Sequence, residues 1–160
     1  MGSVLSARLT AFFPGLFRHH GLQLSAAWQE HREAEAPLYR FPNLINYPRG
    51  FHSHYDKNLW VVSADYAFPV AYPEWSIPYA FYIKRFHLNL FGDYAGASRF
   101  VLNAQGEMET DDVNMYSVGA DLVANVHLLG IFTPVSMGVR SIYMPDREEM
   151  AFRLLFSVSL

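Results

Sequence analysis

The chain has 160 residues, a net charge of −3, 51% hydrophobic residues and no cysteine. This length fits a single domain, residues 1–160, and the lack of cysteine excludes disulfide frameworks and thiolate metal sites. No stretch approaches the roughly 20 apolar residues of a transmembrane helix, and no basic face is visible that would bind nucleic acid. The high aromatic content, 16%, suits strands better than helices.

Apolar and polar residues alternate with a period of two along most of the chain, which is typical of β-strands. The pattern predicts seven strands, at residues 3–13, 21–32, 57–70, 79–94, 113–128, 132–144 and 149–160. The connections alternate between short and long. The short ones are 14–20, 71–78, 129–131 and 145–148, and the long ones are an inserted loop at 33–56 and a connection at 95–112.

The two phases of this alternation differ sharply in chemistry. One phase is almost purely apolar, while the other holds Arg, Asp, Asn, His and Gln, as Ser117 and Asp121 illustrate beside Val118 and Leu122. Lys84 is the exception, because it falls in the apolar phase of its strand. A position at the end of the apolar zone, or a β-bulge that shifts the phase, would account for it.

An antiparallel sheet with one wet face, as in a sandwich or a lipocalin, is one interpretation of this pattern. The interpretation we favour is an all-β fold, an antiparallel transmembrane β-barrel with lipid outside and a polar lumen inside. The predicted strands suit a tilted span of about 9–11 residues. Aromatic residues gather at strand ends, as in an interfacial girdle: Tyr66, Phe68, Tyr72, Trp75, Tyr79, Tyr94 and Tyr143.

Strand parity adds an expectation about the size of the barrel. If the long connections lie outside the cell and the C-terminus faces the periplasm, seven strands place residue 1 on the outside. Bacterial single-chain barrels have an even number of strands. We therefore expect this chain to be the C-terminal part of a larger barrel.

Three motifs contain charged residues that fit together. Arg49 lies in Pro48-Arg49-Gly50-Phe51 within the inserted loop. Asp65 and Asp93 lie in the polar phases of their strands, within Ser63-Ala64-Asp65-Tyr66-Ala67-Phe68-Pro69 and Leu90-Phe91-Gly92-Asp93-Tyr94. Charges inside a protein are tolerated when they are paired and hydrogen-bonded. We therefore predict that the loop folds back into the barrel and that Arg49 contacts both aspartates.

These motifs resemble the C-terminal barrel of the bacterial surface antigen superfamily, the BamA- and TamA-like outer-membrane assembly proteins. The resemblance covers roughly residues 21–160 in the family's order, from Arg49-Gly50-Phe51 through the motifs of Asp65 and Asp93 to Ser117-Val118-Gly119-Ala120-Asp121. The chain departs from the family pattern at Pro48, where an aliphatic residue is usual, and at Asp65, where Glu is usual. By this resemblance, Arg49, Gly50, Phe51, Asp65 and Asp93 form a loop-lock site.

The resemblance implies a location in the outer membrane of a Gram-negative bacterium. It also implies insertion or translocation of outer-membrane proteins or lipids there, without covalent chemistry, catalytic residues, metal or cofactor. The implied partners are outer-membrane lipid, unfolded outer-membrane protein clients and periplasmic domains absent from this chain. Two alternatives stay open: a small self-contained barrel that modifies lipid, and a soluble lipocalin-like binder. Histidines at 19, 20, 52 and 54 and serines such as Ser63 and Ser117 are better explained as polar turn and lumen residues.

Overall fold

The computed structural model describes residues 3–32, 42–54, 56–77, 81–102, 108–128 and 134–158. In this part of the chain the fold is all-β, with one short 3-10 turn at Pro145–Arg147. No helix among the described residues has the length and apolar character needed to cross a membrane. The strands are β1 Ser3–Pro14, β2 Gly21–Arg32, β3 Asp56–Ala71, β4 Trp75–Ile77, β5 Phe81–Leu102, β6 Met108–Leu128, β7 Val135–Met144 and β8 Glu149–Val158.

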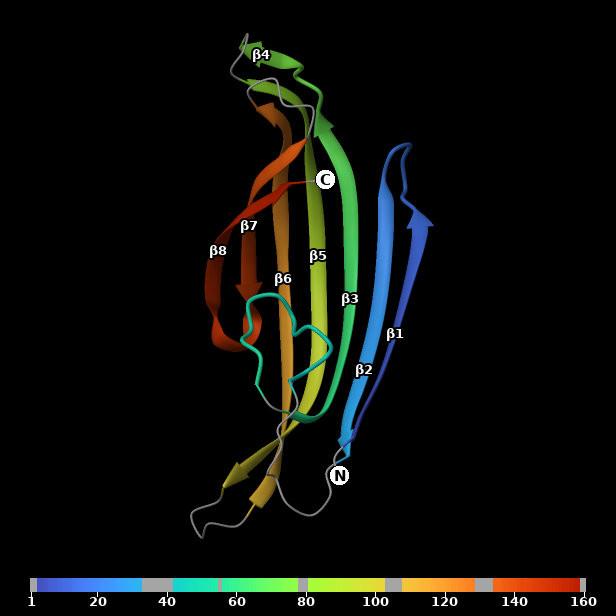
Figure 1. The fold of residues 1–160 in the computed structure, drawn as a ribbon, viewed down its shortest axis with the longest axis vertical. Helices are drawn as coiled ribbons and strands as arrows, with labels where there is room; N and C mark the ends of the chain where they lie inside the picture. The colour runs from blue at the N-terminus through green and yellow to red at the C-terminus, as the bar shows by residue number, and fades with distance from the viewer. Residues whose placement is uncertain are drawn as a thin grey trace.

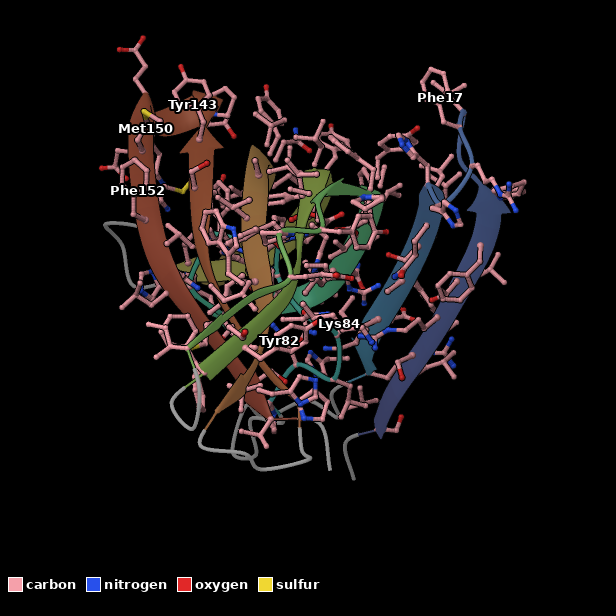
Figure 2. The ribbon with its side chains drawn as sticks, turned by 90° about the horizontal axis from the view of Figure 1, so that it is seen from above. Phe17, Tyr82, Lys84, Tyr143, Met150 and Phe152 are labelled. Atoms are coloured by element: carbon pink, nitrogen blue, oxygen red, sulfur yellow. The ribbon has the colours of Figure 1, made fainter. Side chains whose placement is uncertain are left out.

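All strands belong to one antiparallel sheet in the order β1-β2-β3-β5-β6-β7-β8, with the short β4 paired to β5. The sheet curves into an arc and does not close, so that β1 and β8 form its two edges (Figures 1 and 2). The predicted all-β, antiparallel architecture is confirmed. Each strand pairs with the next one in sequence, except that β3 pairs with β5 and the short β4 also pairs with β5.

The predicted long connection at 95–112 is wrong, because β5 continues to Leu102 and β6 already begins at Met108. The apolar alternation ends near Tyr94, and the small and charged residues beyond it look like a loop. They pair across the ladder instead: Ser98 Oγ donates to Asp112 Oδ1 at 2.6 Å, and Arg99 lies opposite Asp111. Strand β4, inside the predicted connection 71–78, raises the count from seven to eight.

A β-bulge explains the position of Lys84. The ladder between β5 and β6 shifts register between Ile83 and Arg85, so Lys84 has no partner there. On the C-terminal side of the bulge, Arg85 pairs with Asn125 on the concave face, and on the N-terminal side Tyr82 pairs with His127 on the same face. Figure 2 shows Lys84 and Tyr82 inside the arc. The phase shift considered from the sequence is therefore present.

The concave face holds two packed apolar clusters. The first contains Leu59, Ala95 and Met115 from three strands together with Ile45 from the loop. The second contains Phe91, Ile142 and Met144. The convex face instead presents large apolar side chains to the outside, and the labelled Phe17, Tyr143, Met150 and Phe152 lie on the outer side of the arc in Figure 2.

Candidate loop-lock site

Residues 42–54 of the inserted loop cross the concave side of the sheet (Figure 1). At the tip of the loop the amide of Phe51 donates to the carbonyl of Pro48 at 3.2 Å, and Gly50 has a φ of +96°. A Cβ at Gly50 would lie 2.8 Å from Met144 Sδ and 3.1 Å from Ile142 Cγ2. The left-handed backbone therefore favours glycine here, and a Cβ would also have to displace the Met144 side chain.

Arg49 joins the loop to β3 and β5 through its guanidinium. Its Nη1 and Nη2 donate to Asp65 Oδ1 and Oδ2 at 2.7 and 2.9 Å. Its Nε and Nη2 donate to Asp93 Oδ2 and Oδ1 at 2.9 Å each, and its backbone amide also donates to Asp93 Oδ2 at 2.9 Å. A planar guanidinium suits two such bidentate pairs, and a lysine ammonium does not. The structure thus brings together the arginine and both aspartates singled out in the sequence.

The surroundings of this ion cluster are partly closed to water. Side-chain exposure is 20% for Arg49 and Asp65 and 2% for Asp93. Asn89 Nδ2 donates to Asp65 at 2.8 Å, and Ser117 Oγ lies 3.4 Å from Asp93, so the carboxylates have partners besides the arginine. Burial by itself lowers the pKa of Arg49, but the bonds to the two carboxylates outweigh it and raise that pKa above its ordinary value.

Phe91 supports the guanidinium from the floor of the site. Arg49 Cζ lies 3.9 Å from the centre of its ring, and Arg140 Cζ lies 5.5 Å from the same centre. Gly119 makes room for this ring, because a Cβ there would lie 2.5 Å from Phe91 Cζ. Cation–π contacts of this kind contribute about 0.5–2 kcal/mol, depending on desolvation.

Phe51, the third residue of the Arg-Gly-Phe motif, packs against both apolar clusters of the concave face. The guanidinium carbon of Arg147 lies 4.9 Å from the centre of its ring. Arg49 therefore holds the loop by charge and Phe51 holds it by apolar packing, on either side of a glycine that lets the backbone turn.

A second set of contacts, which sequence reasoning missed, holds residues 43–45 of the loop. Gln29 is 1% exposed, and its Oε1 accepts the backbone amides of Leu44 and Ile45. Its Nε2 donates to Asn43 Oδ1 at 2.9 Å, and Asn43 Nδ2 donates to the carbonyl of His54 at 2.6 Å. The sequence marks Gln29 as a polar side chain in the inward phase of its strand, which could have indicated a buried contact. Nothing in the sequence marks Asn43 as its partner.

Two further ion pairs lie on the concave face. Arg99 Nε donates to Asp56 Oδ1 at 2.9 Å, and Arg140 donates to Asp121 at 2.7 and 2.8 Å. Asp121 and Arg140 are direct partners in the β6–β7 ladder. Both residues belong to the polar phase of consecutive predicted strands. This ion pair was therefore predictable once the register of the two strands was assigned.

The other candidates from the sequence make separate contacts within the described residues. His20 Nδ1 lies 2.7 Å from Tyr66 Oη, and His54 contributes its carbonyl to the loop contacts. No three His, Asp or Glu side chains in the described ranges converge as metal ligands do. Ser63 lies in the β2–β3–β5 ladder opposite Ser25 and Asp93.

A cavity of about 820 Å³ lies beside the loop, lined by the three ion-cluster residues and by side chains of β1, β2 and β6 such as Arg8, Gln23 and Asp121. The loop thus fills one part of the concave side and leaves another part open. Comparison of the chain with protein-family models, with curated proteins and with solved structures gives no match.

Proposed function

We propose that this chain is part of an outer-membrane β-barrel of the bacterial surface antigen type that takes part in the insertion or translocation of outer-membrane proteins or lipids. The observation that carries the proposal is the paired contact of Arg49 with Asp65 and Asp93. A loop motif separated from its partners by 16 and 44 positions is held on the concave side of the sheet by five hydrogen bonds. This is the arrangement that the family resemblance implies.

The convex face supports placement in lipid. Leu9 is 72% exposed and Leu154 is 87% exposed, at opposite edges of the sheet. Soluble monomers rarely expose a contiguous apolar area of this extent. Further exposed apolar side chains in the same phase follow on β2 to β8: Leu24, Val62, Leu90, Val118, Leu122, Met137, Val139, Phe152 and Phe156.

Aromatic residues form two groups toward opposite ends of this face. In one group, the Trp60 and Tyr94 rings lie 5.1 Å apart and those of Tyr94 and Tyr116 lie 5.7 Å apart, across β3, β5 and β6. In the other group, Tyr66 and Phe68 contact the β1–β2 turn through His20. Girdles at two levels mark the two interfaces of a membrane barrel. Apart from the three-residue β4, the strands have 10–22 residues, which is long enough for the roughly 9–11 residues of a tilted span.

The ion cluster suggests how such a barrel keeps its lumen partly closed. Arg49, Gly50 and Phe51 fix the tip of the loop to the wall, and Gln29 fixes residues 43–45 of the loop. The loop then excludes water from the apolar clusters below it. Loss of the arginine would leave two neighbouring carboxylates without a counter-charge and would favour a displaced loop.

A client-folding assay tests this function. Liposomes containing the purified protein are mixed with a urea-unfolded eight-stranded outer-membrane barrel, and the folded fraction is read by gel mobility without boiling. We expect faster client folding than in empty liposomes, and a change in that rate for Arg49→Ala. The control is Arg153→Ala, because Arg153 is exposed and has no ion-pair partner in the described part of the chain. Equal folding rates with and without the protein would contradict the proposal.

A further inference from the structure

We propose that the chain has a binding pocket for a phosphate group, at the end of the sheet where the β1–β2 turn lies, next to the larger cavity of the loop-lock site, with which it shares His87. A cavity of about 460 Å³ opens there between the turn, the end of β3 and the start of β5. Figure 2 looks onto this end of the sheet. Its lining includes the side chains of His19, His20, Phe68, Tyr72, Arg85 and His87.

The lining of this cavity has cationic and hydrogen-bonding groups and no carboxylate. Arg85 is exposed and is held in place by Asn125, whose amide oxygen accepts from its Nε and Nη2 at 2.8 and 3.0 Å when that amide is oriented to satisfy both. Nη1 of Arg85 has no partner in the described part of the chain. Asp121 on the adjacent strand is engaged by Arg140. The charge of Arg85 is therefore available to a ligand.

His87 is a second unusual group in the same cavity. Its Nδ1 is buried without a hydrogen-bond partner, so the hydrogen-bonding capacity of the ring is left to Nε2. With Nδ1 unable to bond, the imidazole offers Nε2 as a hydrogen-bond donor to an anionic ligand in a cavity that also holds Arg85.

The turn that closes the cavity is held in a defined shape. His19 has a φ of +71°, an uncommon conformation for a residue other than glycine. Tyr66 Oη accepts the amide of Leu16 at 3.2 Å and lies 2.7 Å from His20 Nδ1, which ties the turn to β3. Backbone strain that is retained under such contacts is found at ligand sites.

Phosphate is the anion that this chemistry fits. A guanidinium recognises phosphate oxygens through parallel N–H donors, and imidazole adds a further donor. The cavity also borders the aromatic group that contains Phe68. If the membrane placement proposed above holds, this is the depth of lipid headgroups. The phosphate can belong to a lipid headgroup or to a free anion, and only the first source rests on the proposed function.

Isothermal titration of the purified protein in an uncharged detergent tests the pocket. The probes are dihexanoyl-phosphatidylglycerol below its micelle concentration and sodium phosphate. We expect saturable binding that weakens about tenfold in Arg85→Gln and in His87→Gln, because a tenfold loss corresponds to about 1.4 kcal/mol, one charge-assisted hydrogen bond. Arg153→Gln is the matched control, since this exposed arginine lies outside the cavity, and far-UV circular dichroism checks that each variant folds.

The outcomes separate the two sources and the two proposals. Binding of the lipid alone assigns a headgroup site, and equal binding of sodium phosphate assigns a free-anion site. No binding of either probe overturns the pocket, as does binding that Arg85→Gln and His87→Gln leave unchanged. Client folding is measured separately, so a negative result there leaves this test intact.

Discussion

The two faces of the sheet are made from alternate residues of the same strands, yet they follow opposite rules. On β3, Asp65 points to the concave side and is bonded to Arg49 and Asn89, while its neighbour Tyr66 belongs to the aromatic group of the convex side. Charges on the concave face gather into bonded sets. The convex face carries exposed apolar residues from edge to edge. The charges of the concave face bond across strands, as Arg49 and Arg140 do, whereas the Arg32–Glu30 pair of the convex phase lies within β2, at the end of that strand.

The largest effect is expected from Arg49→Ala on the concave face. Removal of one partner from a buried ion pair costs about 3–5 kcal/mol, and partial exposure of Arg49 and Asp65 reduces this. Urea unfolding of the membrane-reconstituted protein measures the change in the free energy of unfolding. A double-mutant cycle with Asp93→Asn should give a clear coupling energy, whereas additive effects would mean that the ion cluster does not hold the loop.

The convex face is tested by Leu122→Arg. Leu122 is 47% exposed on β6, and if the proposed membrane placement holds, a charge there costs up to about 2–4 kcal/mol. The matched change is Ser157→Arg, which places the same side chain on the concave face of β8 and should cost less than about 1 kcal/mol. Equal costs for the two variants in the same unfolding experiment would remove the distinction between the faces.

A smaller loss of stability is expected from Gly50→Ala. The flexible Met144 side chain can shift away from the added Cβ, so overpacking costs about 1 kcal/mol, the low end of its usual range, and the left-handed backbone adds about 1–2 kcal/mol. Gly21→Ala serves as the control, because a Cβ there meets nothing within 4 Å. Thermal or urea unfolding should separate the two variants, and similar stabilities would show that the loop tip is not held against β7.

The smallest effect is expected from Gln29→Ala, which removes the acceptor for the amides of Leu44 and Ile45. An unsatisfied donor in this part of the loop costs about 1–2 kcal/mol. Gln23→Ala changes the same residue type on the same strand, where the side chain makes no hydrogen bond in the described ranges. Amide hydrogen exchange should rise at Leu44 and Ile45 in Gln29→Ala alone, and unchanged exchange would contradict this role.

Much of the fold was predictable, because the period of two is strong wherever one face is apolar. The strands around Asp65 and Asp93 and the inward phase of both aspartates follow directly from it. The contact with Arg49 needed one more step, the requirement that charges inside a protein be paired. Where a strand continues beyond its apolar residues, the period of two no longer reveals it. Ser98, Arg99 and Asp112 continue the β5–β6 ladder through polar cross-strand contacts that no hydrophobic period reveals.

Other features depended on details of register and loop geometry. The bulge at Lys84 was visible only as a phase error, which allowed two explanations. The contacts of Asn43 need the path of the loop, and a short polar residue in a loop gives no sign of its partner. The ion pair between Asp121 and Arg140 could have been predicted, because opposite charges in the same phase of neighbouring strands are candidates for a cross-strand pair.

The most direct test of the account compares two neighbouring positions on β8 that point to opposite faces. The chain has no cysteine, so Leu154→Cys and Arg153→Cys each carry a single label. An environment-sensitive fluorophore is attached to each variant in outer membranes of a Gram-negative bacterium that expresses the chain. The account predicts blue-shifted emission that a lipid-soluble quencher reduces at position 154, and water-like emission at position 153. Water-like emission at both positions, or recovery of the chain as a detergent-free soluble protein, would contradict the account.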